Sequence, residues 1–573
     1  MAKTHDAKRR WTAALAVAVG LAACGGNDTS PDPQLSLADT TGAVDVVSDG
    51  VPDMGLDSVP DTGPDGAADA ATDAAGPDDA TDAKDGKDGS GKDTSGTDTS
   101  PVAPWSCGKD GAVFNVVLGR PTATSITASV MAAGGTEVFA EFGTSTGTYT
   151  GKTATLVSAS GEPVEVELGN LQANTRYHYR VSCRPAGGGD FHASDERTFQ
   201  TQRAPGSTFT FGVQGDSHPE REGKMYSPVL YALNMQNVAA KQPDFYFGLG
   251  DDFSIEKLLE KNTLSQTNVD AVYLNQRNFF SILGASTSVF LVNGNHEQAA
   301  GYLLTDAYQT PYAAAPVMAG KARVTFFPLP APNGFYTGDM EQVPGVGLLR
   351  DYYAWQWGDA LFVTLDPYWH SPVPVDTGVP GLEKEPDTWK VSIGDEQYAW
   401  LAKTLTESKA KWKFVFEHHP MGSDRGGAGM AHKYEWGGYD QQGKLYQFPE
   451  RRPTWTKPIH PLLRDTGVTV FFFGHDHLFA REKLDGVVYQ SVPNPADNTY
   501  TAFNADAYDP ETIVYPGAAY DSSYGVVMPD SGFLHVTVSP AKVTVAYVRA
   551  VLPADEATLG VKNGAVALTY DVP

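Results

Sequence analysis

The chain has 573 residues, of which 41% are hydrophobic and 11% aromatic. A chain of this length and composition can bury more than one hydrophobic core, so we expect two folded domains together with non-globular sequence. The formal net charge is −27 and the sequence shows no basic surface suited to nucleic-acid phosphates, which argues against a nucleic-acid-binding protein.

The first 23 residues are typical of an export signal. Basic side chains come first, a mostly small and apolar run follows over 11–20, and Leu21-Ala22-Ala23 precedes Cys24. The apolar run is too short to span a bilayer as a permanent helix. Because a cysteine directly after Leu-Ala-Ala resembles the lipobox of bacterial lipoproteins, we expect cleavage after residue 23 and lipid on Cys24. An ordinary cleaved signal followed by a chance cysteine is the alternative.

The residue after Cys24 bears on where the anchor places the protein. Gly25 stands in place of the aspartate that is associated with retention in the inner membrane. By this resemblance we expect an exported protein, lipid-anchored at the bacterial envelope, at the outer membrane or cell surface rather than the inner membrane. The lipid anchor would be its one contact with a membrane, because no second apolar stretch is long enough to cross one.

Residues 24–103 lack the composition of a folded domain. The stretch 25–103 is nearly all Asp, Ala, Gly, Thr, Ser and Pro, with eighteen Asp, three Lys and no aromatic residue. Such a sequence cannot bury enough apolar surface to offset the entropy lost on ordering. We therefore predict a disordered, self-repelling tether.

Residues 104–204 are predicted to form an all-β sandwich, because short alternating segments are separated by turns rich in Gly, Thr and Pro. The predicted strands cover 112–117, 125–131, 137–142, 164–168, 176–181 and 198–201. The segment from Leu171 to Val181 resembles the tyrosine corner of fibronectin type III domains. In that motif the hydroxyl of a tyrosine, here Tyr177 or Tyr179, binds nearby backbone.

Cys107 and Cys183 are the two thiols that remain if Cys24 carries lipid. Outside the cytoplasm, two cysteines within one small domain can pair. We favour a disulfide between them, with two free buried thiols as the alternative.

The remaining chain, 205–573, is predicted to form a layered domain. Apolar strand-like runs alternate with helical periodicity, as in 226–242 and 394–410. This alternation favours an α/β or α+β domain.

Within this domain, five predicted strands end in side chains of the kind that bind metal ions. These endings are Asp216-Ser-His218, Asp251, Asn295-His296-Glu297, His418-His419-Pro420 and His475-Asp-His477. In α/β sheets ligands bind beyond the carboxyl ends of the strands, so the five endings can converge. A glycine lets the backbone turn sharply and approach an ion, and four of the endings have one just before the ligand: Gly215, Gly250, Gly294 and Gly474.

The chemistry of these side chains narrows the choice of metal. Imidazoles and carboxylates without thiolates suit iron, manganese or zinc better than calcium or magnesium alone. Seven ligands are too many for one ion, so we predict a pair of ions, divalent or of mixed valence.

The order Asp-x-His, Gly-Asp, Gly-Asn-His-Glu, His and Gly-His-x-His closely resembles the calcineurin-like metallophosphoesterases. The resemblance spans 207 to about 550 and implies a four-layer fold, in which helices flank two β-sheets. It also implies the ligands of both ions: Asp216, His218 and His477 for one, Asn295, His418 and His475 for the other, and Asp251 as the bridge.

The same resemblance implies a hydrolase of phosphoric esters, either a phosphatase or a phosphodiesterase, with a phosphorylated small molecule or macromolecule as substrate. The two ions would clamp the phosphoryl oxygens and activate a bridging hydroxide that attacks phosphorus. His296 would protonate the leaving oxygen. The alternative is a catalytically silent cell-surface binding protein on the same scaffold, which the tether and the sandwich would suit.

A β-sandwich before such a domain resembles the N-terminal domain of purple acid phosphatases. Two departures from those enzymes stand in the motifs. Purple acid phosphatases carry glycine where His218 stands and a metal-bound tyrosine where this chain has Ser254. No tyrosinate–iron chromophore is therefore expected.

Three further side chains are candidates for contact with substrate. The family pattern in the fourth block matches His418, which leaves His419 to support or contact the substrate. The glycine-rich stretch 421–440 contains Arg425 and His432, and a cation there can meet a substrate phosphate. A solvated loop without contact to substrate is the alternative.

Overall fold

The computed structural model describes residues 113–305, 307–308, 311–375, 383–420, 425–508 and 521–573. The predicted export signal and tether, and with them Cys24 and Cys107, lie outside these residues, so those predictions remain predictions. In the described part of the chain, no helix combines the length and the apolar character needed to cross a membrane.

The N-terminal described region is all-β and consists of two antiparallel sheets. One sheet has the order β1-β2-β6, and the other has the order β4-β3-β7-β8, with β5 paired to β3 and β9 paired to β7. The strands are β1 (Val113–Gly119), β2 (Ile126–Ala132), β3 (Thr136–Gly143), β4 (Gly151–Lys152), β5 (Leu156–Val157), β6 (Val164–Leu168), β7 (Arg176–Pro185), β8 (His192–Ala193) and β9 (Arg197–Gln200). Alternate side chains of β7, including Tyr177, Tyr179 and Val181, fill the space between the sheets.

Two features of β7 bear on the sequence predictions. The backbone N–H of Gln172 donates to the hydroxyl of Tyr177 at 2.9 Å, which confirms that this tyrosine binds nearby backbone. The assignment to the fibronectin type III class stays a prediction. Cys183 is buried and disulfide-bonded. Because Cys107 lies outside the described residues, the pairing of the two also stays a prediction.

The second region contains two β-sheets. The first has the order β12-β11-β10-β23-β24-β25, and β10, β11 and β12 are mutually parallel. Its strands are β10 (Phe209–Gln214), β11 (Phe245–Gly248), β12 (Ser288–Leu291), β23 (Gly532–Val538), β24 (Val543–Arg549) and β25 (Val566–Val572).

The second sheet has the order β13-β16-β17-β18-β19-β21-β20-β22, and β17, β18, β19 and β21 are parallel. Its strands are β13 (Thr337–Gly338), β16 (Tyr353–Trp357), β17 (Ala360–Thr364), β18 (Trp412–Glu417), β19 (Val470–Phe473), β20 (Phe479–Leu484), β21 (Val487–Ser491) and β22 (Val526–Met528). A separate hairpin joins β14 (Gln342–Val343) to β15 (Gly347–Leu348).

An aromatic core holds the two sheets face to face. Phe211 and Phe247 of the first sheet pack against Phe362 and Phe416 of the second, and the rings of Phe247 and Phe416 stack with centroids 3.9 Å apart. These strands are buried on both faces, as is usual for parallel strands that lie between other layers.

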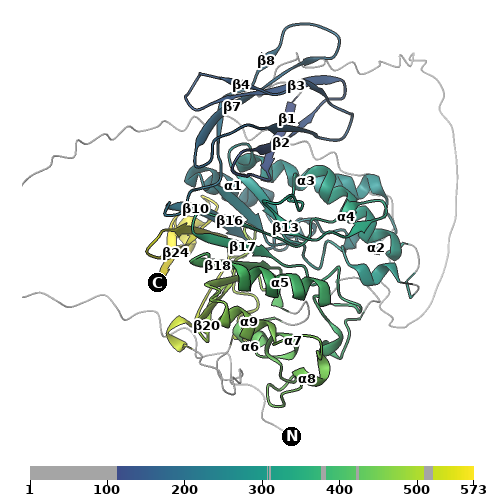
Figure 1. Cartoon of the computed structure of the whole chain (residues 1–573), viewed down its shortest axis with the longest axis vertical. Helices are drawn as coiled ribbons and strands as arrows, with labels where there is room; N and C mark the ends of the chain where they lie inside the picture. Colours follow the sequence, from purple (N-terminus) through teal and green to yellow (C-terminus); the bar gives the residue numbers. More distant parts are fainter. Residues whose placement is uncertain (1–112, 306, 309–310, 376–382, 421–424, 509–520) are drawn as a thin grey trace, which may run out of the picture. The chain divides into compact units, whose positions relative to one another are not determined.

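Helices cover the outer faces of both sheets (Figure 1). Met235 of α1 packs with Tyr246 on the first sheet, and Leu401 of α5 packs with Val415 on the second. The helices are α1 (Pro228–Lys241), α2 (Glu256–Glu260), α3 (Gln266–Gly284), α4 (Ala315–Phe326), α5 (Asp395–Glu407), α6 (Ala428–Ala431), α7 (Tyr434–Gly437), α8 (Phe448–Arg451), α9 (Ile459–Asp465) and α10 (Glu556–Leu559). The predicted four-layer fold is therefore confirmed.

The sandwich and the layered domain share a buried polar contact. Arg277 of α3 is fully buried, and its guanidinium donates to the side chain of Asn115 at 2.8 Å and to the carbonyl of Ser129 at 2.7 Å. It also donates to the carbonyl of Phe326, at the end of α4. One side chain thus links two strands of the sandwich to two helices of the neighbouring domain.

Candidate metal centre

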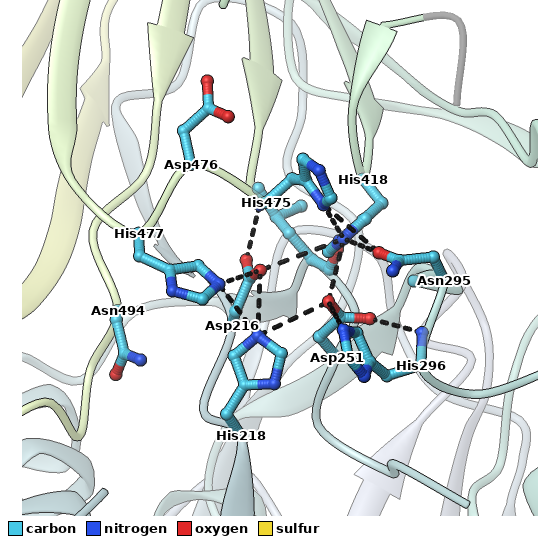
Figure 2. Close-up of polar contacts among 12 residues, drawn as sticks. Asp216, His218, Asp251, Asn295, His296, His418, His475, Asp476, His477 and Asn494 are labelled. Atoms are coloured by element: carbon cyan, nitrogen blue, oxygen red, sulfur yellow. Dashed lines mark hydrogen bonds and ion pairs between the residues drawn. The ribbon is translucent and has the colours of Figure 1, made fainter. Parts of the chain in front are cut away.

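The seven predicted ligands lie together at the carboxyl ends of five parallel strands (Figure 2). β10, β11 and β12 supply the ligands from the first sheet, and β18 and β19 supply those from the second. All seven side chains are buried: Asp216, His218, Asp251, Asn295, His418, His475 and His477.

Glycines make the close approach of the loops possible, as predicted. Gly250 has φ +98°, and a Cβ built on it would lie 2.4 Å from the backbone nitrogen of Gly294. A Cβ on Gly474 would lie 2.4 Å from Oδ1 of Asp216. Any larger residue would therefore push the strand ends apart.

Four of the seven side chains belong to residues with backbone in the left-handed region, with φ between 51° and 66°: His218, Asp251, His475 and His477. Residues with a Cβ rarely adopt this conformation, which costs of order 1 kcal/mol each. The surrounding structure holds them there, and such strained residues cluster at functional sites.

Asp216, His218 and His477 form the first group. Nε2 of His218 lies 2.8 Å from Nε2 of His477 and 3.6 Å from Oδ2 of Asp216. Nε2 of His477 lies 3.1 Å from the same oxygen. Two imidazole nitrogens and one carboxylate oxygen therefore face a common point.

Asn295, His418 and His475 form the second group. The side-chain oxygen of Asn295 lies 3.0 Å from Nε2 of His418 and 3.2 Å from Nδ1 of His475. The two ring nitrogens are 3.2 Å apart. This group offers two imidazole nitrogens and a neutral oxygen.

Asp251 lies between the two groups (Figure 2). Its Oδ2 is 3.5 Å from Nε2 of His218 in the first group and 3.2 Å from Nε2 of His418 in the second. Oδ2 of Asp216 is also 3.9 Å from Nε2 of His418. Asp251 thus has the position that a bridging ligand needs.

The two carboxylates share one arrangement. Oδ1 of Asp216 accepts from the backbone N–H of His475 at 2.7 Å, and Oδ1 of Asp251 accepts from the backbone N–H of His296 at 2.8 Å. Oδ2 of each carboxylate is buried and accepts no hydrogen bond from the described residues. One oxygen therefore fixes the side chain, and the other is left for a cation.

The far nitrogens of two histidines are also held. Nδ1 of His218 lies 2.7 Å from a carboxylate oxygen of Glu220, and Nδ1 of His418 lies 2.8 Å from the carbonyl oxygen of Leu249. A proton on each Nδ1 leaves each Nε2 unprotonated, with its lone pair directed toward the centre. This is the usual arrangement of metal-bound histidines.

These distances fit metal ions. With metal–ligand bonds of about 2.1 Å, neighbouring ligand atoms around one ion lie roughly 3.0–3.4 Å apart, close to the spacings observed within each group. Nitrogen and oxygen donors without sulfur suit borderline ions such as zinc, iron or manganese. The described residues therefore fit two such ions.

The charges of the centre favour cations as well. Burial opposes a charge on His218, but the carboxylates of Glu220 and Asp216 outweigh it and raise the pKa of His218 to about 10. For His418, burial is likewise outweighed by Asp251 and Asp216, and its pKa rises to about 10. The buried carboxylates thus draw protons onto both imidazoles, and metal binding would release those protons.

His296 lies at the edge of the centre. Its Nδ1 is 2.7 Å from a carboxylate oxygen of Glu256, and its Nε2 is 3.8 Å from Oδ2 of Asp251. Burial lowers the pKa of His296, but Asp251 and Glu256 outweigh burial, and the net shift is upward. Arg221 is also close, with Nη2 3.5 Å from Nε2 of His296.

Three glutamates support the centre, and sequence reasoning assigned them no role. Glu220 and Glu256 orient His218 and His296. Glu297 accepts from the backbone N–H groups of Asp251 at 3.0 Å and of Gly294 at 2.6 Å, and so joins the ends of β11 and β12. Glu297 belongs to the Gly-Asn-His-Glu block, whereas nothing in the linear pattern singles out the other two.

The candidates for substrate contact differ in position. His419 is buried, its ring stacks on His475 with centroids 3.9 Å apart, and its Nδ1 lies 2.7 Å from the hydroxyl of Tyr368. Arg425 is part-buried and donates to the carbonyl of His475.

His432 stacks on Tyr439 with ring centroids 4.2 Å apart. Contact of His432 with substrate stays a prediction.

Comparisons with known proteins agree with this geometry. Residues 209–479 match the family model of the calcineurin-like phosphoesterases. The structure of the purple acid phosphatase PPD1 from yellow lupin (Lupinus luteus) seeds is similar, with a TM-score of 0.50 and 16% identity over 80% of this chain and 74% of that chain. The structure of PhoD has a TM-score of 0.53 and 15% identity, over 80% of this chain and 90% of that chain.

No curated protein sequence matches this chain. At these low identities the likeness to the two solved structures shows the fold alone. The family model and the metal-type cluster add the chemistry, because the model covers all five strand endings. The chain therefore contains a calcineurin-like phosphoesterase domain, and its class is that of phosphoric ester hydrolases built on the metallophosphoesterase fold.

Proposed function

We propose that the protein hydrolyses phosphoric esters with a pair of metal ions held by the seven buried side chains. One observation carries this proposal. Oδ2 of Asp216 and Oδ2 of Asp251 are buried without a hydrogen bond from the described residues, and the ring nitrogens of four histidines surround them. Charges in a protein interior are usually paired or coordinate metal ions, so two buried carboxylates that face imidazole nitrogens favour cations.

The ligand assignment follows the two groups. Asp216, His218 and His477 hold one ion, the second group holds the other, and Asp251 contacts both. Iron, manganese and zinc suit these donors. When bound, such ions neutralise the phosphoryl oxygens and lower the pKa of a bound water, which is the chemistry that ester hydrolysis needs.

His296 is the proposed general acid. Glu256 holds its Nδ1, so Nε2 is turned toward the centre, where it lies 3.8 Å from Oδ2 of Asp251. A proton at Nε2 can pass to the leaving oxygen of the ester. Arg221, beside this nitrogen, adds a positive charge at the place where a phosphate would bind.

Replacing Asp251 tests the proposal. The full chain, supplied with Fe, Mn or Zn, is assayed on chromogenic phosphomonoesters and phosphodiesters. Asp251→Asn should lower kcat/KM at least about 100-fold, because even residues that only support metal ligands contribute about 10–100-fold. Asp359→Asn is the matched control, since Asp359 lies in the half-buried turn between β16 and β17 and its carboxylate accepts from the backbone N–H of Gly206 at 2.9 Å.

The two substrate classes separate a phosphatase from a phosphodiesterase. No turnover of either class by the metal-loaded wild type would contradict the enzyme and favour the silent binding protein. Equal turnover by wild type and Asp251→Asn would contradict the assigned centre.

We also propose that the protein is exported and lipid-anchored through Cys24, as the start of the sequence predicts. Cys24→Ala should move the protein from the membrane fraction to the soluble fraction of the cell envelope. An unchanged membrane fraction would contradict the lipid anchor.

A further inference from the structure

A second cluster of metal-type side chains lies outside the seven-residue centre. Asp339, Asp351 and His370 place one potential ligand atom each within 4.8 Å of one another. Asp339 and Asp351 are buried, and the side chain of His370 is 14% exposed. The cluster shares no residue with the catalytic centre.

The topology explains why these three residues meet. Asp339 directly follows β13, Asp351 lies two residues before β16, and His370 follows β17. Because β13 is antiparallel to β16, and β16 is antiparallel to β17, the end of β13, the start of β16 and the end of β17 lie at the same edge of the sheet. Three separate chain segments therefore converge there.

A backbone N–H holds Oδ1 of each carboxylate in the cluster, as in the seven-residue centre. Oδ1 of Asp339 accepts from the backbone N–H of Glu341 at 2.8 Å, and Oδ1 of Asp351 accepts from the backbone N–H of Tyr352 at 2.8 Å. Oδ2 of Asp351 lies 3.1 Å from Nε2 of His370. Oδ2 of Asp339 is buried and accepts no hydrogen bond from the described residues.

Among the described residues, few positive charges lie near Oδ2 of Asp339. Asp339 is 3% exposed, and His370 is the one basic side chain within ion-pair distance of either carboxylate in the described part of the chain. Two buried carboxylates facing one imidazole leave negative charge without a partner, which is costly unless a proton or a cation neutralises it.

We propose that Asp339, Asp351 and His370 form a further cation site, separate from the catalytic pair, for a borderline divalent ion of the Zn²⁺ type. Two carboxylate oxygens and one imidazole nitrogen are the donor set that such ions take, with the remaining positions left to water. The ion would tie the segment after β13 to the segment after β17, across the start of β16.

The pKa values of the cluster agree with a missing positive charge. Burial, together with the carboxylate of Asp351, raises the pKa of Asp339 to about 7. Burial lowers the pKa of His370, but the bond to Asp351 outweighs it and raises the pKa to about 9. In the alternative state, Asp339 is protonated and donates a hydrogen bond to Asp351. The cluster would then bind no metal.

Zinc stoichiometry tests the site. The full chain is dialysed to equilibrium against ZnCl₂ at pH 7.5, and bound zinc is measured by elemental analysis. Wild type should hold one equivalent more than Asp339→Asn. Glu341→Gln, which removes a side-chain charge from the same loop but keeps the backbone N–H that binds Asp339, should match wild type. Equal zinc in wild type and Asp339→Asn would overturn the proposal.

The comparison is independent of the catalytic centre. If the seven-residue centre bound no ion, the difference of one equivalent between wild type and Asp339→Asn would remain, so the two proposals can fail separately. Should Asp339→Asn not fold, crystals of wild type soaked in zinc decide. An anomalous difference peak among Asp339, Asp351 and His370 supports the site, and its absence overturns it.

Discussion

Hydrogen bonds fix the orientation of two histidines in the centre. His218 and His418 each have one ring nitrogen held by an acceptor, Glu220 and the carbonyl of Leu249, and this leaves the other nitrogen bare toward the carboxylates. For His418 the hydrogen-bond acceptor, Leu249, comes from a distant part of the chain. Mutating such partners typically weakens metal binding or activity by about 10–100-fold, so Glu220 matters although it binds no ion itself.

His296 gives a prediction that separates acid catalysis from metal binding. His296→Gln should lower kcat by about 10²–10⁴-fold on alkyl phosphates, whose leaving oxygen needs a proton. The loss should be much smaller on nitrophenyl esters, whose leaving group departs as an anion. Stopped assays of both substrates measure this ratio, and metal content should match wild type. An equal loss on both substrates would contradict the role as acid.

His460 predicts how stability depends on pH. It is buried on α9, with Nδ1 2.8 Å from the hydroxyl of Tyr489. Burial lowers its pKa from 6.5 to about 4, against the opposing effect of Asp485. Between these values the unfolded chain binds more protons than the folded one, so stability falls as pH drops from about 6.5 to about 4. The difference between the two pKa values corresponds to about 3 kcal/mol of unfolding free energy.

Urea unfolding of wild type and His460→Asn at pH 7 and pH 4.5 measures this contribution. Wild type should lose more unfolding free energy on acidification than the variant, by up to about 3 kcal/mol. Parallel losses in the two proteins would show that His460 does not titrate as assigned.

At the level of elements, the centre depends on strand ends that approach closely. Gly474→Ala would place a methyl group 2.4 Å from Oδ1 of Asp216 and so displace this carboxylate. We expect a loss of about 1–3 kcal/mol of stability together with reduced metal occupancy. Gly169→Ala is the matched control, because a Cβ there meets only the Glu167 carboxylate at 4.0 Å. Equal metal content in both variants, measured by elemental analysis, would contradict the argument.

Much of this level could be predicted from the sequence. Apolar runs that end in a metal-type side chain, four of them with a glycine just before it, predicted β10, β11, β12, β18 and β19, and the seven side chains do converge. Periodicity placed α1 and α5 within a few residues of their ends. Such local signals are strong because burial imposes the pattern on consecutive residues.

Other parts of the site left no local signal. Glu256 binds His296 from a short helix, and Asp339 meets Asp351 and His370 only because β13, β16 and β17 are neighbours in the sheet. These contacts follow from strand order, which a single sequence does not encode in any spacing.

At the scale of the whole molecule, we expect the contacts of Arg277 to couple the unfolding of the sandwich to that of the layered domain. Arg277→Ala removes the donors to the buried carbonyls of Ser129 and Phe326 and leaves a cavity. The loss should be about 3 kcal/mol or more. Scanning calorimetry should show the two domains melting together in wild type and separately in the variant. Arg176→Ala is the control, since Arg176 contacts Thr198 within the sandwich.

A single cooperative transition in Arg277→Ala, at the temperature of wild type, would show that this contact does not couple the domains.

The proposed hydrolase activity depends on two cations bound among seven buried side chains. Crystals of the protein reconstituted with iron, manganese or zinc, measured at the absorption edge of the metal, test this most directly. We predict two anomalous difference peaks, one among Asp216, His218 and His477 and the other among Asn295, His418 and His475, both in contact with Asp251. Under saturating metal, an empty map or a single peak would contradict the two-ion centre.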